Sequence, residues 1–382
     1  MRSTSVSVRD ISDAVGSWSA RIGMVRVEFG AGALARLGQL AAELGGRRAM
    51  LVTDRGIEDA GHVDRALGTF AGLAVDAFVF DGVEENPTTA HVEAGRRFAA
   101  EHEIDLIIGL GGGSVMDCAK GINFLLTNGG RMEDYWGVGK ATQPMLPSLG
   151  VPTTAGTGSE AQSFALIAQP DTHLKMACGD EKAHFRTVIL DPELTATVPG
   201  SVAVATGLDA IAHAVESYVS TARNPVSQMY AREAWRLLAP NFLASLANAA
   251  DIEVRGKMQV GAYLAGAAIE CSMLGAAHAC ANPLAARFDI THGIAVAAML
   301  PAVVRFNTEV VANLYDELSP SLGDTILELR RPSGHEFGLG ALGVDRGSLG
   351  ELAAEAARQW TAGFNPRPVT EHDLLTLYEA SF

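Results

Sequence analysis

The repeating pattern of this chain changes near residue 190, and that change limits the possible folds more than any other feature. Before it, short apolar runs alternate with stretches of helical periodicity, as in a parallel sheet covered by helices. After it, long alanine-rich helical segments follow one another. We therefore predict an α/β domain over residues 1–190 and an all-α domain over residues 191–382, since 382 residues fit two domains of ordinary size.

Four strands are predicted in the first domain, with two helices among the segments between them. The strands are RAMLVTD ending at Asp54, VDAFVFDGV ending at Val83, DLIIGLG ending at Gly111 and PSLGVPTT ending at Thr154. The helices are GHVDRALGTFAGL and TTAHVEAGRRFAAEHE. In the second domain, helices are predicted for SVAVATGLDAIAHAVESYVS, PVSQMYAREAWRLLAPNFLASLANAA and GIAVAAMLPAVVRF.

The charge balance argues against two classes of partner. The chain has 29 basic and 44 acidic residues and a net charge of −15, which repels phosphate backbones and anionic lipid. Nucleic acid and membranes are therefore not expected partners. The four cysteines lack zinc-knuckle spacing and are few for a disulfide scaffold, and residues 1–20 lack the apolar run of an export signal. We expect a cytoplasmic protein with reduced thiols.

One segment, residues 260–286, is long and weakly polar enough to resemble a membrane span. Glu270, His278 and Asn282 lie within it, and Pro283 interrupts it. Polar residues of this kind are rare inside a lipid bilayer, so we predict a buried helical core instead.

A glycine turn joins a strand to a helix in DLIIGLGGGSVMDCAKGINFLL. Gly111, Gly112 and Gly113 allow close approach of a ligand to the backbone. Ser114 begins a helix whose free N–H groups can hold a phosphate. A dinucleotide diphosphate is one interpretation, and simple packing of the turn is the other, because Ser114 replaces the last glycine of the usual G-x-G-x-x-G pattern.

A second glycine and hydroxyl cluster, VPTTAGTGSEA, follows the strand that ends at Thr154. Its hydroxyl groups belong to Thr153, Thr154, Thr157 and Ser159, at the carboxyl edge of the sheet where α/β folds bind ligands. Asp54 closes another strand at that edge, where its carboxylate could accept from a ribose hydroxyl and would repel a 2′-phosphate. This favours NAD over NADP, although Asp54 could instead cap a helix.

A candidate metal site comes from two distant apolar segments. GLDAIAHAVESYVS places Asp209 and His213 four residues apart, one above the other on a helix. Such a pair can satisfy itself by hydrogen bonding inside a core. However, GAAHACANPLAARFDITHG adds His278 and His292 in a similar apolar context. One carboxylate and three imidazoles suit Fe(II) or Zn(II), with one position open for a substrate oxygen.

Together these motifs resemble the iron-containing alcohol dehydrogenase family, the group III metal-dependent type. The pattern is visible in GGGSVMDCAKG, PTTAGTGSEA, DPELT, GLDAIAHAVESY and HACANPLAARFDITHG, and it covers nearly the whole chain. The resemblance implies a parallel-sheet dinucleotide-binding domain and a helical metal-binding domain, the dehydroquinate synthase-like architecture. It also places the metal ligands at Asp209, His213, His278 and His292.

The resemblance further implies hydride transfer between NAD(H) and an alcohol and its aldehyde or ketone. Catalytic residues beyond the metal centre are not identified by the resemblance. By position, Gln162 and Phe164 would touch cofactor or substrate. We expect a small-molecule substrate and a homodimer or higher homo-oligomer. The implied cofactor contacts are Asp54, Asn86, Gly112, Gly113, Ser114, Asp117, Thr153, Thr154, Thr157, Lys175 and Leu194.

The chain departs from the family pattern at two places. Asn282 stands where many relatives have a histidine that passes protons, and an amide cannot titrate. Residues 318–344 look shorter than the helical part of most relatives. Alternatives within the same fold are a glycerol dehydrogenase-like or maleylacetate reductase-like enzyme. A catalytically silent nucleotide-binding relative is an alternative of another class, and the four intact ligand positions argue against it.

Overall fold

The computed structural model describes residues 16–171 and 174–382, which form two compact units. Unit 1 ends at Val198, and unit 2 runs from Pro199 to Phe382. The boundary predicted near residue 190 falls at the end of β10 (Thr187–Leu190). Unit 1 extends further because the 3-10 helix after β10 inserts Leu194 into its core. The prediction about an export signal concerns a segment that lies mostly outside the described residues.

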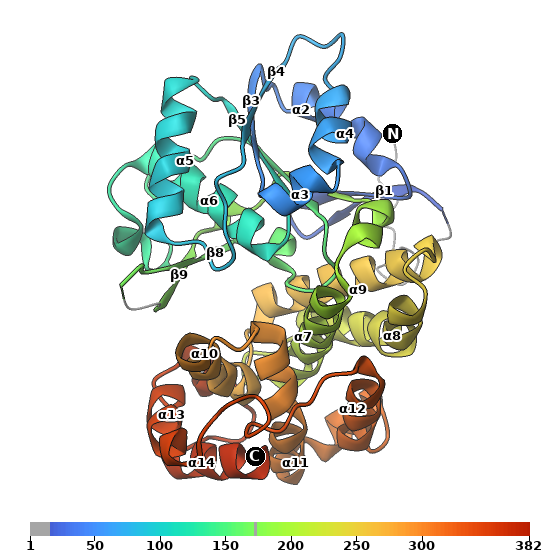
Figure 1. Cartoon of the computed structure of the whole chain (residues 1–382), viewed down its shortest axis with the longest axis vertical. Coiled ribbons are helices and arrows are strands. Elements are labelled where there is room, and N and C mark those ends of the chain that lie inside the picture. The colour runs from blue at the N-terminus through green and yellow to red at the C-terminus, as the bar shows by residue number, and fades with distance from the viewer. Residues whose placement is uncertain (1–15, 172–173) are drawn as a thin grey trace. The chain divides into compact units, whose positions relative to one another are not determined.

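Unit 1 is built on a seven-stranded sheet with the order β1-β2-β10-β7-β5-β3-β4 (Figure 1). The β1–β2 pair is an antiparallel hairpin, and the other neighbouring strands are parallel. The strands besides β10 are β1 (Trp18–Ile22), β2 (Val25–Phe29), β3 (Arg48–Val52), β4 (Asp76–Phe80), β5 (Leu106–Gly111) and β7 (Ser148–Pro152). The predicted parallel sheet is confirmed, whereas the sequence analysis did not predict the hairpin.

Helices cover both faces of this sheet. As a result, every residue of β5 is buried. Leu106, Ile108 and Leu110, alternate residues of β5, share one core with helices α2 and α4. Helices α5 and α6 lie on the other side of the sheet in Figure 1. The helices of unit 1 are α2 (Leu37–Glu43), α3 (Arg55–Asp59), α4 (His62–Gly68), α5 (Thr89–Glu101) and α6 (Gly113–Asn128).

Shorter elements complete unit 1. A second sheet has the order β6-β9-β8, formed by β6 (Gly137–Val138), β9 (Lys175–Gly179) and β8 (Phe164–Ala168). This sheet is an addition to the four strands predicted from the sequence. The 3-10 helices are Ala33–Arg36, Met132–Tyr135, Ser159–Ala161, Glu181–Ala183 and Pro192–Thr197.

The regular elements described in unit 2 are helices, as predicted (Figure 1). Every residue from Gly207 to Val219 of α7 is buried, so α7 is enclosed by its neighbours. The α-helices are α7 (Gly200–Val219), α8 (Pro225–Ala247), α9 (Ile252–Ser272), α10 (Ala276–Phe288), α11 (His292–Leu318), α12 (Leu322–Arg330), α13 (Leu349–Ala356) and α14 (Glu371–Ala380). Short 3-10 helices span Arg331–Ser333, Arg346–Ser348 and Trp360–Phe364.

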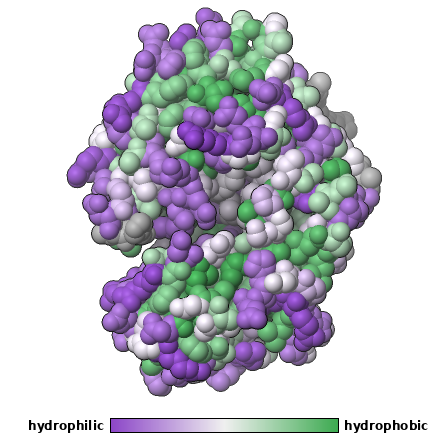
Figure 2. Space-filling view, in the orientation of Figure 1, coloured by the Kyte–Doolittle hydropathy of each residue, from purple (hydrophilic) through white to green (hydrophobic). Residues whose placement is uncertain are grey.

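The weakly polar segment 260–286 forms parts of two helices. Helices α9 and α10 are bent by 105° at the break between them, where Met273 has a φ of 73°. Among the residues that the structure describes, α11 is the one single helix long and apolar enough for a membrane span, and 72% of its apolar window is buried in the protein. On the face drawn in Figure 2, hydrophilic and hydrophobic residues are interspersed.

Candidate metal centre and nucleotide-binding loop

Three polar side chains lie on one face of the buried helix α7. Asp209, His213 and Glu216 are spaced by four and three residues, which places them one above another on a helix. Each of the three is exposed by no more than 5%. His213 Nε2 lies 3.4 Å from Asp209 Oδ1. The helix therefore directs a carboxylate and an imidazole into the interior of unit 2.

Two further imidazoles reach Asp209 from other helices. Nε2 of His278 on α10 lies 3.3 Å from Asp209 Oδ1, and Nε2 of His292 at the start of α11 lies 3.9 Å from the same oxygen. The residue after His292 is Gly293, and a Cβ there would lie 2.0 Å from the carbonyl oxygen of Ala205 on α7. Glycine is required at this position because α11 approaches the backbone of α7 so closely.

The cluster fits a metal ion. Asp209, His278 and His292 each offer a ligand atom within 4.8 Å of the others. His213 belongs to the same cluster because its Nε2 lies beside Asp209 Oδ1. The ring of His213 also stacks on that of His278, with the ring centroids 4.9 Å apart. Asp209 Oδ1 and His278 Nε2 are buried and have no hydrogen-bond partner within the described ranges. Buried polar atoms normally have a partner, so a cation bound directly to both atoms accounts for their arrangement.

The electrostatics of the cluster favour positive charge. Burial alone would raise the pKa of Asp209, but the surrounding imidazoles of His213, His278 and His292 bring this pKa below its ordinary value. Burial opposes protonation of His278, yet the carboxylates of Glu216 and Asp209 raise the pKa of His278 to about 9. A divalent ion at this cluster would supply the positive charge that protons otherwise provide.

Glu216 is a residue of this cluster that the sequence analysis did not select. Its carboxylate accepts a hydrogen bond from Nδ1 of His278 and another, of 2.8 Å, from the backbone N–H of Ala277. The signal was available, because Glu216 follows Asp209 and His213 on the same helical face at the i, i+4, i+7 spacing.

The predicted nucleotide loop lies in unit 1, where the glycine turn between β5 and α6 meets the threonine loop after β7. Thr153 N–H donates to the carbonyl oxygen of Gly111 at 3.0 Å. A Cβ on Gly113 would lie 2.7 Å from Thr157 Cγ2, so the two loops are in direct contact. Since Gly112 precedes α6 and has no side chain to cap it, the free N–H groups of the first turn can bind an anion.

Three more predicted contacts lie around this turn. Asn86 has a positive φ of 54°, and its N–H donates to Ser114 Oγ at 3.3 Å. Thr154 lies beside Gly112, with its Cγ2 3.6 Å from the position of a Cβ on that glycine. Asp54 follows β3, the neighbour of β5, and caps α3 by accepting from the N–H of Ile57 at 3.0 Å. The helix-cap alternative for Asp54 therefore describes its contact in this structure.

Asp117 belongs to a buried network under the loop. Ser159 Oγ donates to Asp117 Oδ1 at 2.6 Å, and Lys120 Nζ donates to the carbonyl oxygens of Ser159 and Phe164 at 2.6 and 2.7 Å. Burial raises the pKa of Asp117, and the positive charges of Lys120 and Lys175 oppose that shift. Lys120, which the sequence analysis did not select, thereby ties α6 to the threonine loop.

The remaining predicted residues are more scattered. Leu194 is fully buried in the core of unit 1, so the structure does not present it as an accessible nucleotide contact. Lys175 is exposed at the start of β9. In unit 2, Asn282 Nδ2 donates to Gln359 Oε1 at 3.0 Å. Gln162 Nε2 donates to the carbonyl oxygen of Thr157 at 3.4 Å, beside the glycine turn.

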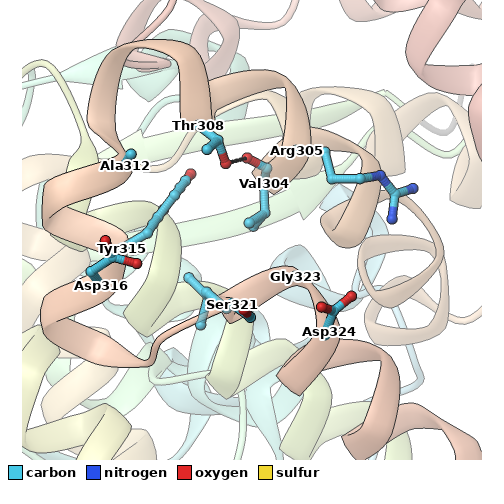
Figure 3. A pocket seen from close by; sticks show the side chains of 10 residues that line it. Val304, Arg305, Thr308, Ala312, Tyr315, Asp316, Ser321, Gly323 and Asp324 are labelled. Carbon is cyan, nitrogen blue, oxygen red and sulfur yellow. Dashed lines mark hydrogen bonds between the residues drawn. The ribbon is translucent and has the colours of Figure 1, made fainter.

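Unit 2 also has a cavity of about 300 Å³ between α11 and α12 (Figure 3). Its lining includes Arg305, Asp316 and Asp324, all exposed, and the guanidinium of Arg305 points away from Tyr315 in this view. The lining contains none of the residues predicted for the metal or the nucleotide. The Asp209 cluster, which offers metal-ligand atoms, is therefore the candidate centre of unit 2.

Comparison with known proteins places both units in the same protein family. The protein-family model for iron-containing alcohol dehydrogenase matches residues 25–192. The family model for the C-terminal part of Fe-containing alcohol dehydrogenases matches residues 203–382. The 1,3-propanediol dehydrogenase of Klebsiella pneumoniae is 32% identical over 93% of this chain and 96% of its own length. The NAD-dependent methanol dehydrogenase of Bacillus methanolicus is 30% identical over 91% of this chain and 95% of its own length. The crystal structure of a 1,3-propanediol oxidoreductase, 31% identical, superimposes with a TM-score of 0.90 over 97% of this chain and 100% of that one.

Proposed function

Because the chain belongs to the iron-containing alcohol dehydrogenase family, we propose that the Asp209 cluster of unit 2 is its metal centre and the glycine turn of unit 1 its NAD site. Membership makes the chain an oxidoreductase that acts on alcohols or aldehydes and uses NAD(H) and a metal. The observation that carries the metal assignment is the convergence of three imidazole Nε2 atoms within 3.9 Å of one carboxylate oxygen.

Asp209, His213, His278 and His292 would hold the metal, and we propose Fe(II) or Zn(II) because this ligand set suits both. A bound divalent ion supplies Lewis acidity toward the oxygen of the substrate. Asp209 contributes one negative charge and the neutral imidazoles contribute none, so the site keeps a positive charge that favours a negatively charged substrate oxygen. The burial of Asp209 and His278 keeps water away from these ligand atoms.

The turn in unit 1 would hold the dinucleotide. The N–H groups at the start of α6 would bind its diphosphate, and Gly113 leaves the backbone accessible beside Thr157. The carboxylate of Asp54 would accept from a ribose hydroxyl and repel a 2′-phosphate, which supports NAD over NADP. Positioning of the nicotinamide is the protein's part in hydride transfer, since the redox chemistry belongs to the cofactor.

We propose an alcohol or its aldehyde as substrate, because relatives named for 1,3-propanediol, methanol and long-chain alcohols each cover more than nine tenths of this chain. Asn282 cannot pass a proton, so proton release from the alcohol would run through water or a ribose hydroxyl. The cytoplasmic location and the homo-oligomer stay predictions from the sequence.

The test begins with protein purified under nitrogen. Elemental analysis should find about one Fe or Zn per chain. A panel of short alcohols with NAD, followed by the absorbance of reduced cofactor, should give metal-dependent turnover. His278→Ala should lose both metal and activity, and His335→Ala, a histidine outside the cluster, should keep both. Full turnover by metal-free protein, or by His278→Ala, would contradict the proposal.

A further inference from the structure

We propose that Glu216 is a positioning residue that holds His278 in the tautomer able to bind the metal. This inference rests on the proposed function of the Asp209 cluster and adds a residue that is not itself a ligand. Glu216 lies on α7 and His278 on α10, and both side chains are only 4% exposed. Their contact is therefore shielded from water.

The hydrogen bonds of Glu216 determine which nitrogen of His278 carries a proton. A carboxylate accepts hydrogen bonds and donates none, so His278 Nδ1 is the donor to Glu216 Oε2. The proton on Nδ1 leaves the lone pair on Nε2. This is the atom that lies 3.3 Å from Asp209 Oδ1, on the side of the other ligands. Glu216 thus directs the metal-binding lone pair of His278 into the cluster.

The start of α10 fixes Glu216 in turn. Glu216 Oε1 accepts from the N–H of Ala277, and Asn365 Oδ1 accepts from the N–H of Ala276 at 3.2 Å. These acceptors satisfy two N–H groups that a helix end leaves free, and a negative carboxylate is favoured there. A Cβ on Gly275 would lie 3.0 Å from both acceptor oxygens, so glycine leaves room for them.

Partners of this kind orient a metal-binding imidazole and raise its basicity, and their loss typically weakens metal binding by 10- to 100-fold. Glu216 performs both tasks through one carboxylate, since one oxygen holds the helix that carries His278 and the other holds the ring. A change at Glu216 should therefore appear first in metal affinity, even before any substrate is added.

Glu216→Gln tests this directly. Glutamine keeps the size of the side chain and an oxygen for Ala277, but its amide N–H₂ faces Nδ1 of His278 and favours a proton on Nε2 instead. We expect Zn(II) affinity, measured by competition with a chelator, to fall by about 10- to 100-fold. Glu216→Asp, which keeps a carboxylate, should recover part of the loss. Glu317→Gln is the matched control, because Glu317 also bonds to other side chains, Tyr218 and Arg232, but lies outside the cluster.

A second measurement uses the unchanged protein and does not depend on how the variant folds. In zinc-loaded protein with ¹⁵N-labelled histidine, His278 should show a hydrogen-bonded proton on Nδ1 and none on Nε2, assigned by its loss in His278→Ala. Undiminished zinc affinity in Glu216→Gln, while His278→Ala loses zinc, overturns the role of Glu216 alone. A proton on Nε2 overturns that role and also removes Nε2 of His278 from the proposed metal ligands. Failure of the unchanged protein to bind zinc or iron overturns the metal centre and this role together.

Discussion

Oδ1 of Asp209 and Nε2 of His278 lie 3.3 Å apart, and both are buried without a hydrogen-bond partner among the residues described. One side chain comes from α7 and the other from α10. Burial of an unsatisfied polar atom costs about 1–3 kcal/mol, and a cation bound to both atoms would offset this cost. If the pair binds a metal as proposed, its disruption should affect metal binding more than folding.

Asp209→Asn should reduce metal content and alcohol-dependent NAD reduction by roughly 100-fold or more, since a direct ligand matters at least as much as its supporting residues. The amide keeps the size of the side chain but removes the negative charge that holds the cation. Elemental analysis and a steady-state assay measure the two effects. Asp324→Asn, an exposed residue of α12, is the control. Normal metal content in Asp209→Asn would show that the ion binds elsewhere.

The apolar segments that carry the four proposed ligands could be found from the sequence pattern. That these segments meet at one centre was implied only by the family resemblance. Asp209 and His213 share one helical face by spacing alone, but no periodicity links α7 to His278 or His292. The contact of Gly293 with Ala205 brings α11 onto α7, and this is a tertiary packing event. Glu216 has the correct helical spacing, but spacing alone does not distinguish a buried acidic residue from a solvated one.

Gly113→Ala should weaken NAD binding by roughly tenfold, since a Cβ placed 2.7 Å from Thr157 Cγ2 forces the two loops apart, and overpacking of this kind costs about 1–3 kcal/mol. Titration calorimetry with NAD measures the change. Gly68→Ala is the control, because a Cβ at that helical position of unit 1 meets nothing within 4 Å. Equal NAD affinity in the two variants would remove the glycine turn from the nucleotide site.

The strands of unit 1 could be predicted where the sequence has long apolar runs. Strands with short apolar runs were harder to predict. The predicted strands ending at Asp54 and Thr154 stop two residues earlier, at Val52 and Pro152, and Asp54 caps α3. The hairpin β1–β2 was not predicted, because charged residues leave only short apolar runs in WSARI and VRVEF. Lys120 was overlooked because its partners, the carbonyl oxygens after β7, are distant in sequence.

The stability of unit 1 should depend on the protonation of Glu160. Burial raises the pKa of Glu160 from 4.5 to about 7, more than its own backbone N–H and Lys120 lower it. Because the folded pKa lies above the unfolded value, this contribution to stability is fully present below about pH 4.5 and is lost as the pH rises through 7. The wild-type protein should therefore lose free energy of unfolding across that range.

Glu160→Gln removes this dependence because glutamine cannot ionise. Relative to wild type, the variant should gain on the order of 2 to 3 kcal/mol in free energy of unfolding between pH 5 and pH 8. Denaturant titrations at the two pH values measure it, with Glu85→Gln, an exposed residue, as control. The same difference from wild type at both pH values would mean that Glu160 does not titrate in this range.

Asn282→His should change how the rate depends on pH. The amide of Asn282 donates to Gln359 Oε1 at 3.0 Å, and an imidazole N–H can make the same bond, so the variant should fold normally. It adds a group that titrates near pH 6.5, whereas Asn282 does not titrate. If proton transfer now runs through water or ribose, the pH–rate profile of kcat should gain an inflection in this range. Asn282→Ala removes the amide without adding a titrating group and should keep the original profile. If the histidine variant also keeps that profile, position 282 takes no part in proton transfer in this chain.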